Sequence, residues 1–122
     1  MKKTFSGNPK SKQIKKWNIN EFTNPKIMAE YLMDGVTIPK GSKVIVNQYK
    51  NKDNLQGLEA KKHGGIKGNY ILDEDRALIL AGPFKHEEVG FWTVEKEIVD
   101  KLNQEFEEKW DEASKIKFEE KK

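Results

Sequence analysis

The final segment of the chain carries a helical pattern of apolar positions. After Thr93, whose side chain suits the N-cap of a helix, apolar residues recur every three or four positions. These residues are Val94, Ile98, Leu102, Phe106, Trp110 and Ala113. The spacing predicts a long amphipathic C-terminal helix over residues 93–118.

This helix would be too long for one small domain. It would extend about 37 Å at ~1.5 Å per residue, whereas a domain of this length is only roughly 26 Å across. We therefore expect the helix to project and to pair with a second copy, which would make the protein an oligomer. The alternative is a single helix that lies across its own sheet.

Residues 24–35 show a second pattern with helical spacing. Pro25 suits the first position of a helix, and Gly35 can take the left-handed conformation that ends one. The apolar residues between them, which fall on one helical face, are Ile27, Met28, Tyr31 and Leu32. The segment predicts a short N-terminal helix.

The middle of the chain is rich in strand patterns. Residues 44–48 alternate, residues 55–62 form a weaker strand candidate, and residues 89–93 end in an extended aromatic pair. Residues 70–72 and 77–80 flank a polar turn, which predicts a hairpin. We expect an α+β fold in which a small, mostly antiparallel sheet of about four or five strands precedes the C-terminal helix.

Charge is distributed unevenly along the 122 residues. Residues 1–16 hold six lysines and no acid, residues 17–92 are balanced, and from residue 93 onward ten acids outnumber seven lysines. We interpret residues 1–18 as a flexible basic arm and residues 19–122 as a single α+β domain. A basic arm and an acidic tail indicate head-to-tail contact or an anionic partner.

Composition excludes several classes of protein. The chain has no cysteine, which removes disulfides, thiol catalysis and thiolate metal sites. No apolar stretch approaches the ~20 residues of a membrane span, and no secretory signal follows the first lysines. We expect a soluble, cytoplasmic protein without membrane contact. Lysine supplies every cation except Arg76, a usage typical of A/T-rich genomes, such as those of low-GC bacteria and their phages.

A glycine- and lysine-rich stretch over residues 60–78 is the first candidate site. Glycine amides can turn toward a phosphate, and nearby cations can neutralise it. The candidate ligands in this stretch are Lys61, Lys62, His63, Gly64, Gly65, Lys67, Asn69 and Arg76. No Gly-Lys-Ser/Thr motif is present and a strand rather than a helix follows, so a mobile hairpin loop is the competing interpretation.

An aromatic cluster at the junction of sheet and final helix is the second candidate. Phe84, Phe91 and Trp92 surround glycine and proline residues, and such rings can stack on a base beside lysines. The same rings could instead form the core where the helix meets the sheet. Trp17, beside the basic arm, is the aromatic residue whose exposure would favour base stacking most.

No catalytic or metal-binding set emerges. Residues 73–75 are all acidic, but neighbouring side chains in a tight turn rarely converge on one Mg²⁺ ion, and these are ordinary turn residues. His63 and His86 are too few for a metal site, and no activated nucleophile completes a mechanism. We predict a protein that is not an enzyme and has no cofactor or metal.

Three functions follow from these features. The first is a non-enzymatic, oligomeric protein that sequesters a small anionic, nucleotide-like ligand; its small, lysine-rich chain is in character with a phage or mobile-element counter-defence protein. The alternative is a nucleic-acid-binding accessory protein that uses residues 1–16, with Trp17 stacking on a base. A third is an inhibitor that docks on another protein and whose acidic helix could imitate nucleic acid.

Overall fold

One mixed sheet organises the chain. The computed structural model describes residues 10–85 and 88–116, and within them an eight-stranded sheet has the order β1-β7-β6-β5-β2-β3-β4-β8. The pairs β2–β3 and β3–β4 are parallel, whereas the other neighbours are antiparallel. The strands are β1 (Ser11–Ile14), β2 (Lys26–Leu32), β3 (Lys43–Tyr49), β4 (Glu59–Lys62), β5 (Asn69–Leu72), β6 (Ala77–Leu80), β7 (Gly90–Thr93) and β8 (Ser114–Lys115).

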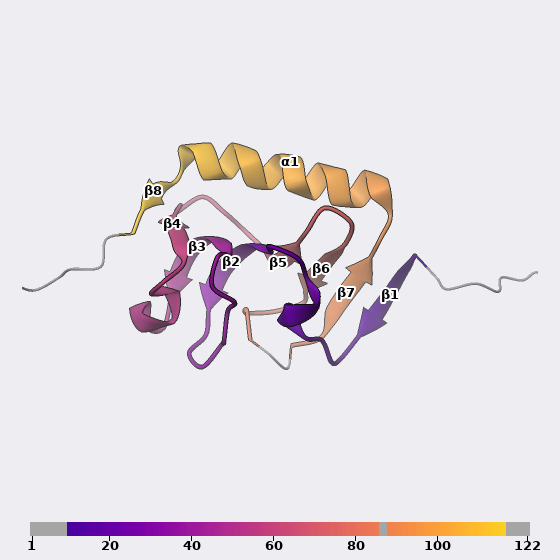
Figure 1. The fold of residues 1–122 in the computed structure, drawn as a ribbon, viewed down its shortest axis with the longest axis horizontal. Helices are drawn as coiled ribbons and strands as arrows, with labels where there is room; N and C mark the ends of the chain where they lie inside the picture. The colour runs from indigo at the N-terminus through magenta and orange to yellow at the C-terminus, as the bar shows by residue number, and fades with distance from the viewer. Residues whose placement is uncertain (1–9, 86–87, 117–122) are drawn as a thin grey trace, which may run out of the picture.

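The remaining regular elements are helical. The helix α1 (Lys96–Glu112) lies across one face of the sheet, from the β7 side to the β4 side (Figure 1). Two short 3₁₀ helices, η1 (Ile19–Glu21) and η2 (Lys52–Leu55), lie in the segments that connect the strands.

The predicted N-terminal helix is wrong, because its residues form the central strand β2. β2 pairs with β3 on one side and with β5 on the other. Consecutive residues Ile27, Met28 and Ala29 are all buried, since both faces of this strand are covered. A strand buried on both faces loses the alternation of a half-exposed strand, and its apolar run then resembles a helical stripe.

The sheet is larger than the predicted four or five strands. The hairpin of β5 and β6 is confirmed, as are strands β3, β4 and β7. The additional strands are the misassigned β2 and the two edge strands, β1 and β8. Both edges are short and polar, so neither carries an apolar pattern in the sequence.

The C-terminal helix is present but shorter than predicted. It begins at Lys96, because Thr93 belongs to β7 and its Oγ1 accepts a hydrogen bond from the Glu95 amide at 3.0 Å. It ends at Glu112, and the chain then pairs with β4 through β8. Its 17 residues span about 25 Å at ~1.5 Å per residue. Residues 117–118 of the predicted helix lie outside the described residues.

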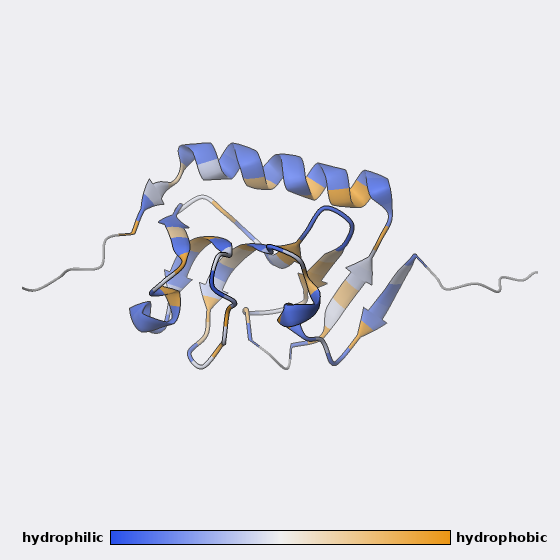
Figure 2. Ribbon diagram, viewed as in Figure 1, coloured by the Kyte–Doolittle hydropathy of each residue, from blue (hydrophilic) through white to orange (hydrophobic). Residues whose placement is uncertain are grey.

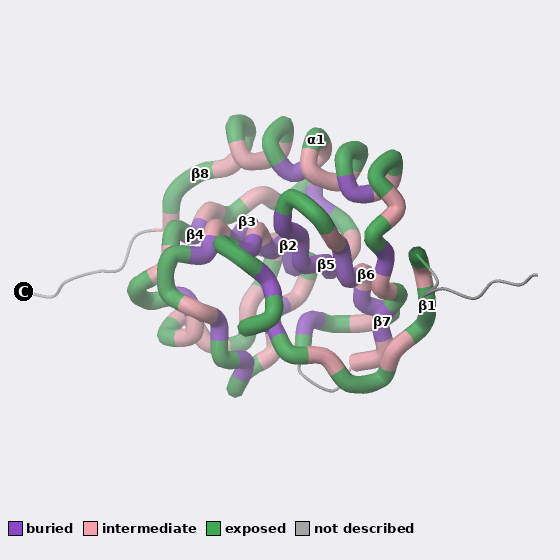
Figure 3. The backbone as a smooth tube through the Cα atoms, turned by 45° about the vertical axis from the view of Figure 1, so that its right-hand side comes forward, coloured by how far each residue is buried: buried purple, intermediate pink, exposed green. Residues whose placement is uncertain are grey.

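Both faces of the sheet carry a hydrophobic core. On the helix side, Val99 and Phe106 of α1 pack against Met28 and Ile45 of the sheet. On the other side, the connecting segments cover a second cluster that includes Ile27, Leu78 and Phe84. The apolar side of α1 faces the sheet while its outer side is hydrophilic and exposed (Figures 2 and 3). The apolar stripe that motivated self-association thus packs against the sheet of its own chain, fully at Phe106 and partly at Leu102 and Trp110. An oligomer formed through this helix stays a prediction.

The predicted basic arm overlaps a strand. Residues 11–14 form β1, which pairs in antiparallel register with β7 from Ser11↔Thr93 to Ile14↔Gly90. The hydroxyl groups of Ser11 and Thr93 lie 2.7 Å apart and join the two strands further. Residues 1–9 of the arm lie outside the described residues.

Candidate functional site

A groove lies at the β1 edge, on the face of the sheet that α1 does not cover. Its volume is about 480 Å³. Strands β1, β6 and β7 supply its floor, and the segment that follows β1 supplies much of its wall. The lining residues are Lys12, Ile14, Lys16, Trp17, Asn18, Glu21, Phe22, Arg76, Leu78 and Trp92. The groove therefore combines two indole rings with three cations and one carboxylate.

The floor is a row of side chains across three paired strands. Lys12 lies opposite Trp92, and Trp92 lies opposite Leu78. Side chains that face one another in an antiparallel sheet project from the same face. The Nζ of Lys12 lies 5.5 Å from the centre of the Trp92 ring, which is a cation–π distance. Strand pairing thus sets the Trp92 ring beside an exposed ammonium group.

Trp17 is held in place by contacts with the opposite loop. Its indole N–H donates a hydrogen bond to the carbonyl oxygen of Glu88 at 2.9 Å. Its ring meets Phe84 edge-on, with the ring centres 6.0 Å apart. The indole is only partly buried, so it can offer surface to a ligand without moving.

Arg76 closes the groove from the β5–β6 turn. Its Nε lies 3.3 Å from Oδ2 of Asp73, and its guanidinium carbon lies 5.7 Å from the centre of the Phe22 ring. Asp73 also accepts a hydrogen bond from the Thr23 amide at 3.1 Å. The turn therefore ties the wall segment to the sheet and fixes the cation in position.

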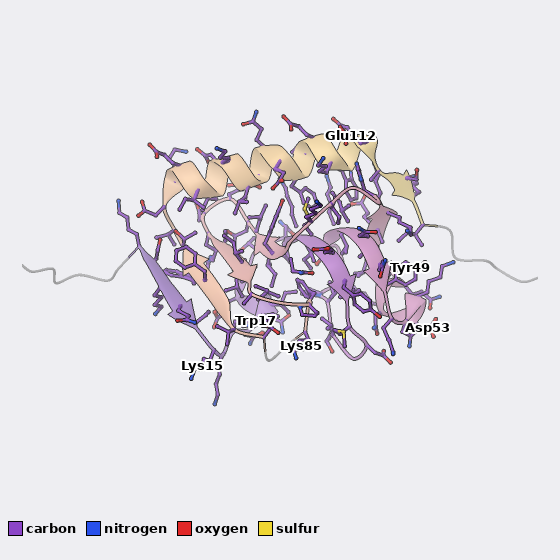
Figure 4. All side chains as sticks on the ribbon, turned by 180° about the vertical axis from the view of Figure 1, so that it is seen from behind. Lys15, Trp17, Tyr49, Asp53, Lys85 and Glu112 are labelled. Carbon is purple, nitrogen blue, oxygen red and sulfur yellow. The ribbon has the colours of Figure 1, made fainter. Side chains whose placement is uncertain are left out.

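Exposed lysines gather at the β1 edge, away from the acidic end of α1. Lys15, Trp17 and Lys85 lie on the side of the sheet away from α1, whereas Glu112 lies at the end of the helix (Figure 4). Lys12, Lys15 and Lys16 are exposed. Among the described residues, none of these three has a carboxylate within ion-pair distance. An anionic partner thus meets uncompensated cations on the groove side.

The glycine- and lysine-rich stretch has its polar groups engaged within the chain. The Gly65 amide donates to Nδ1 of His63 at 2.9 Å, and the Gly68 amide donates to Oε1 of Glu30 at 3.0 Å. His63 also lies 2.8 Å from Glu112, and its hydrogen bond, with the charge of Lys109, lowers the pKa of Glu112. The amides that a phosphate cradle needs are therefore already used at two of its three glycines.

The lysines of this stretch separate from one another. Lys61 contacts Trp110 at the end of α1, whereas Lys62 and Lys67 are exposed. Asn69 is buried, and its Oδ1 accepts a hydrogen bond from the Tyr31 amide at 3.3 Å. These residues and Gly64 lie away from the groove, and of the candidate ligands in the stretch only Arg76 lines it.

The predicted aromatic cluster also divides. Phe84 is fully buried in the core beneath Trp17, whereas Phe91 points to the helix side and is 41% exposed. Only Trp92 of the three lines the groove. Successive residues of a strand point to opposite faces, so Phe91 and Trp92 could not share one site.

The site as observed joins parts that the sequence analysis treated separately. Lys12, Lys16 and Trp17 belong to the basic-arm hypothesis, whereas Arg76 and Trp92 belong to the ligand hypothesis. Asn18, Glu21 and Phe22 were not anticipated, because no signal in the sequence shows that their segment folds back beside β7.

The described part of the chain lacks a metal-binding cluster and a membrane-spanning helix. No group of three or more His, Asp or Glu side chains there is arranged to hold a metal ion. No helix of residues 10–85 and 88–116 has the length and apolar character of a membrane-spanning segment. His86 lies outside these ranges.

Comparison with known proteins shows similarity at the level of the fold. No protein family model and no curated protein sequence matches the chain. A solved structure of TrmBL2, described as an archaeal chromatin protein with a novel mode of DNA binding, superposes with a TM-score of 0.53 at 12% sequence identity. The match covers 88% of this chain but only 54% of the TrmBL2 chain. The two proteins thus share a fold over about half of TrmBL2.

Proposed function

We propose that this protein binds nucleic acid, with DNA as the first candidate, through the β1 edge and the groove beside it. The observation that carries the proposal is the lining of that groove. Trp17 and Trp92 offer ring surface, while Lys12, Lys16 and Arg76 offer positive charge. Aromatic rings beside cations are the combination that binds bases and phosphates together.

The distribution of charge supports this side of the fold as the contact surface. Residues 10–16 hold four lysines and no acid. The helix on the opposite face is rich in acids, which repel a phosphate backbone. A polyanion would therefore approach the β1 edge with the groove facing it and the helix facing away.

The fold similarity to TrmBL2 supports the same class of partner. TrmBL2 is described as a chromatin protein that binds DNA. At 12% identity the similarity carries no residue correspondence, so the argument for this chain rests on its own lysines and rings. The sequestration of a small nucleotide-like ligand and the docking on another protein stay predictions.

Contacts made by lysines determine how binding depends on salt and on base sequence. Each lysine that neutralises a phosphate releases a counterion, so affinity falls as salt rises. Lysine lacks the forked guanidinium that reads guanine in the major groove. We therefore expect binding that depends strongly on salt and weakly on sequence.

The test removes the lysine charges at the β1 edge while keeping strand β1 in the sheet. Removing residues 1–16 would delete β1 and expose the edge of β7, so a loss of binding could reflect lost structure. The triple variant Lys12→Gln, Lys15→Gln, Lys16→Gln keeps the backbone pairing and removes three charges. Its matched control is Lys62→Gln, Lys67→Gln, Lys101→Gln, which removes three exposed lysines elsewhere.

DNA affinity is measured by fluorescence polarisation across a series of salt concentrations. For a duplex, we expect the slope of log K against log salt to become shallower by about 2–3 in the β1 variant, because each phosphate contact contributes roughly 0.9. The control variant keeps most of the slope. If the intact protein binds no DNA at low salt, or if both variants lose affinity equally, the proposal is wrong.

A further inference from the structure

The groove has a feature that a surface for duplex phosphates does not need. A protein that only follows a phosphate backbone requires exposed cations, and residues 10–16 supply them. Here, two indole rings from distant parts of the chain are also brought to the same groove. Both indole rings are partly exposed, although burying so large an apolar side chain in the core would stabilise the fold.

The rings are fixed before any ligand arrives. Trp17 is held by its hydrogen bond to the Glu88 carbonyl at 2.9 Å and by the edge of Phe84. The backbone of Trp92 is held by strand pairing with β1 and with β6, and its side chain packs against the hydrophobic core on this face of the sheet. Stacking on a fixed ring costs little conformational entropy, which favours binding.

The volume and charge of the groove fit a nucleotide. About 480 Å³ lies within the range of roughly 300–1,000 Å³ for small-ligand sites. Lys12, whose Nζ lies 5.5 Å from the Trp92 ring centre, can reach a phosphate of the nucleotide whose base stacks on that ring. Lys16 and Arg76 add positive charge to the same lining.

We infer that the groove stacks an unpaired base, so that the protein binds a single nucleic-acid strand more tightly than a duplex. Within a duplex, each base has both faces covered by its neighbours and cannot lie against an indole ring. An unpaired base offers a free face, and stacking on an aromatic side chain is tolerant of sequence. This inference rests on the proposed function and specifies the form of nucleic acid that the groove recognises.

The test compares two variants of adjacent aromatic residues. Trp92→Leu removes the ring in the groove, while Phe91→Leu removes the next ring on the same strand, which points to the helix side. A fluorescein-labelled DNA oligonucleotide of mixed sequence is used alone and after annealing to its complement. Thermal unfolding of each variant shows whether the fold is retained.

We expect Trp92→Leu to lower affinity for the single strand by roughly 5- to 160-fold, which is the fold-change equivalent of ~1–3 kcal/mol for one stacked base. Affinity for the duplex should change by less than about twofold, since the lysines remain. Phe91→Leu should leave both affinities unchanged. Trp92→Phe should restore most of the single-strand affinity, because a smaller ring still stacks.

The outcomes separate the inference from the proposed function. If the intact protein binds neither form, both are wrong. If it binds duplex and single strand equally, and Trp92→Leu changes neither affinity, only the inference about unpaired bases is wrong. An equal loss for both forms in Trp92→Leu, with no rescue by Trp92→Phe, also contradicts it.

Discussion

The ammonium group of Lys61 on β4 contacts Trp110 at the end of α1 in two ways. Its Nζ donates a hydrogen bond to the Trp110 carbonyl oxygen at 3.0 Å and lies 4.3 Å from the centre of the Trp110 ring. The same carbonyl accepts a hydrogen bond from the Ala113 amide at 3.3 Å, so the ammonium group adds a second, charged donor at the end of the helix. Lys61 therefore acts in the fold rather than in the groove.

Replacing Lys61 should loosen the end of the helix. Lys61→Met keeps the apolar stem and removes the ammonium group, and we expect a loss of about 1–2 kcal/mol in the free energy of unfolding. Urea denaturation followed by circular dichroism measures it. Lys62→Met, on the next residue of the same strand and exposed, serves as the control and should be nearly neutral. Equal effects of the two substitutions would refute the contact's role.

Gly90 of β7 lies against two buried leucines of β6. A Cβ atom at this position would lie 2.6 Å from Cδ1 of Leu78 and 3.2 Å from Cδ2 of Leu80. Inside a strand, replacing glycine by alanine usually raises the free energy of unfolding by about 0.5–1 kcal/mol. Crowding of buried leucines costs more than this, so we expect Gly90→Ala to destabilise the protein by about 1–3 kcal/mol.

A double variant identifies the cause of that destabilisation. If crowding against Leu78 is responsible, Leu78→Ala should cost less in the Gly90→Ala background than in the natural chain. A coupling free energy of about 0.5 kcal/mol or more would support this explanation. Additive effects in urea denaturation would show that the two side chains do not conflict.

Asp73 organises the β5–β6 turn with both carboxylate oxygens. Oδ1 accepts hydrogen bonds from the amides of Asp75 at 2.8 Å and Arg76 at 3.0 Å, while Oδ2 accepts from Thr23 at 3.1 Å. Asp73→Ala leaves these donors without their acceptor, and we expect a loss of about 2–3 kcal/mol in unfolding free energy. Asp75→Ala, at an exposed position, should be nearly neutral in the same urea titration.

The same turn should be insensitive to magnesium. The Asp73 carboxylate already binds backbone and Arg76 donors, so it cannot turn toward an ion without losing them. Millimolar Mg²⁺ should therefore leave the unfolding temperature of the protein and of Asp75→Ala unchanged. A rise in unfolding temperature that requires residues 73–75 would contradict this.

Tyr70 links stability to alkaline pH. The phenol is buried under α1 and donates a hydrogen bond to Oε1 of Glu105 at 2.9 Å. Burial first, and then the charge and hydrogen bond of Glu105, raise the pKa of Tyr70 well above its ordinary value of 10.0. A raised pKa means that the unfolded chain loses this proton first, so the contribution to stability is complete below pH 10 and declines above it.

Tyr70→Phe should remove that dependence. We expect the variant to be less stable by about 0.5–1.5 kcal/mol near neutral pH, because one hydrogen bond is lost. Between about pH 9 and about pH 11, the difference between the two proteins should shrink as the unfolded phenol ionises. Urea denaturation at each pH measures the difference; a gap that stays constant would contradict the role of Tyr70.

Sequence patterns predicted those elements whose signals are local. The β5–β6 hairpin followed from two apolar runs around the polar residues 73–76, and the helix followed from its repeat of apolar positions. Strand β2 was missed because burial on both faces removes the alternation that marks a strand. Strands β1 and β8 were missed because an edge strand is held by backbone pairing and needs few apolar residues.

The groove could be predicted only in pieces. Trp17 and the lysines before it were noticed as a basic arm, and Trp92 was noticed as part of an aromatic cluster. Their meeting depends on the pairing of β1 with β7, a long-range contact that no local pattern encodes. In the glycine-rich stretch, the Gly68 amide has a partner, Glu30, that lies far away in sequence and could not be foreseen from the local pattern. The role of this stretch as a binding site stays a prediction.

The pairing of Ser11 with Thr93 also fixes when the groove can form. The two residues are 82 positions apart, and a chain emerges from the ribosome with its N-terminal end first. The basic segment is therefore synthesised early, but it can pair at the sheet edge only after β7 has been synthesised. Closing so long a loop is slow, so the groove should be among the last parts of the molecule to form. A nascent chain should therefore expose the lysines in and beside β1 long before its binding groove exists.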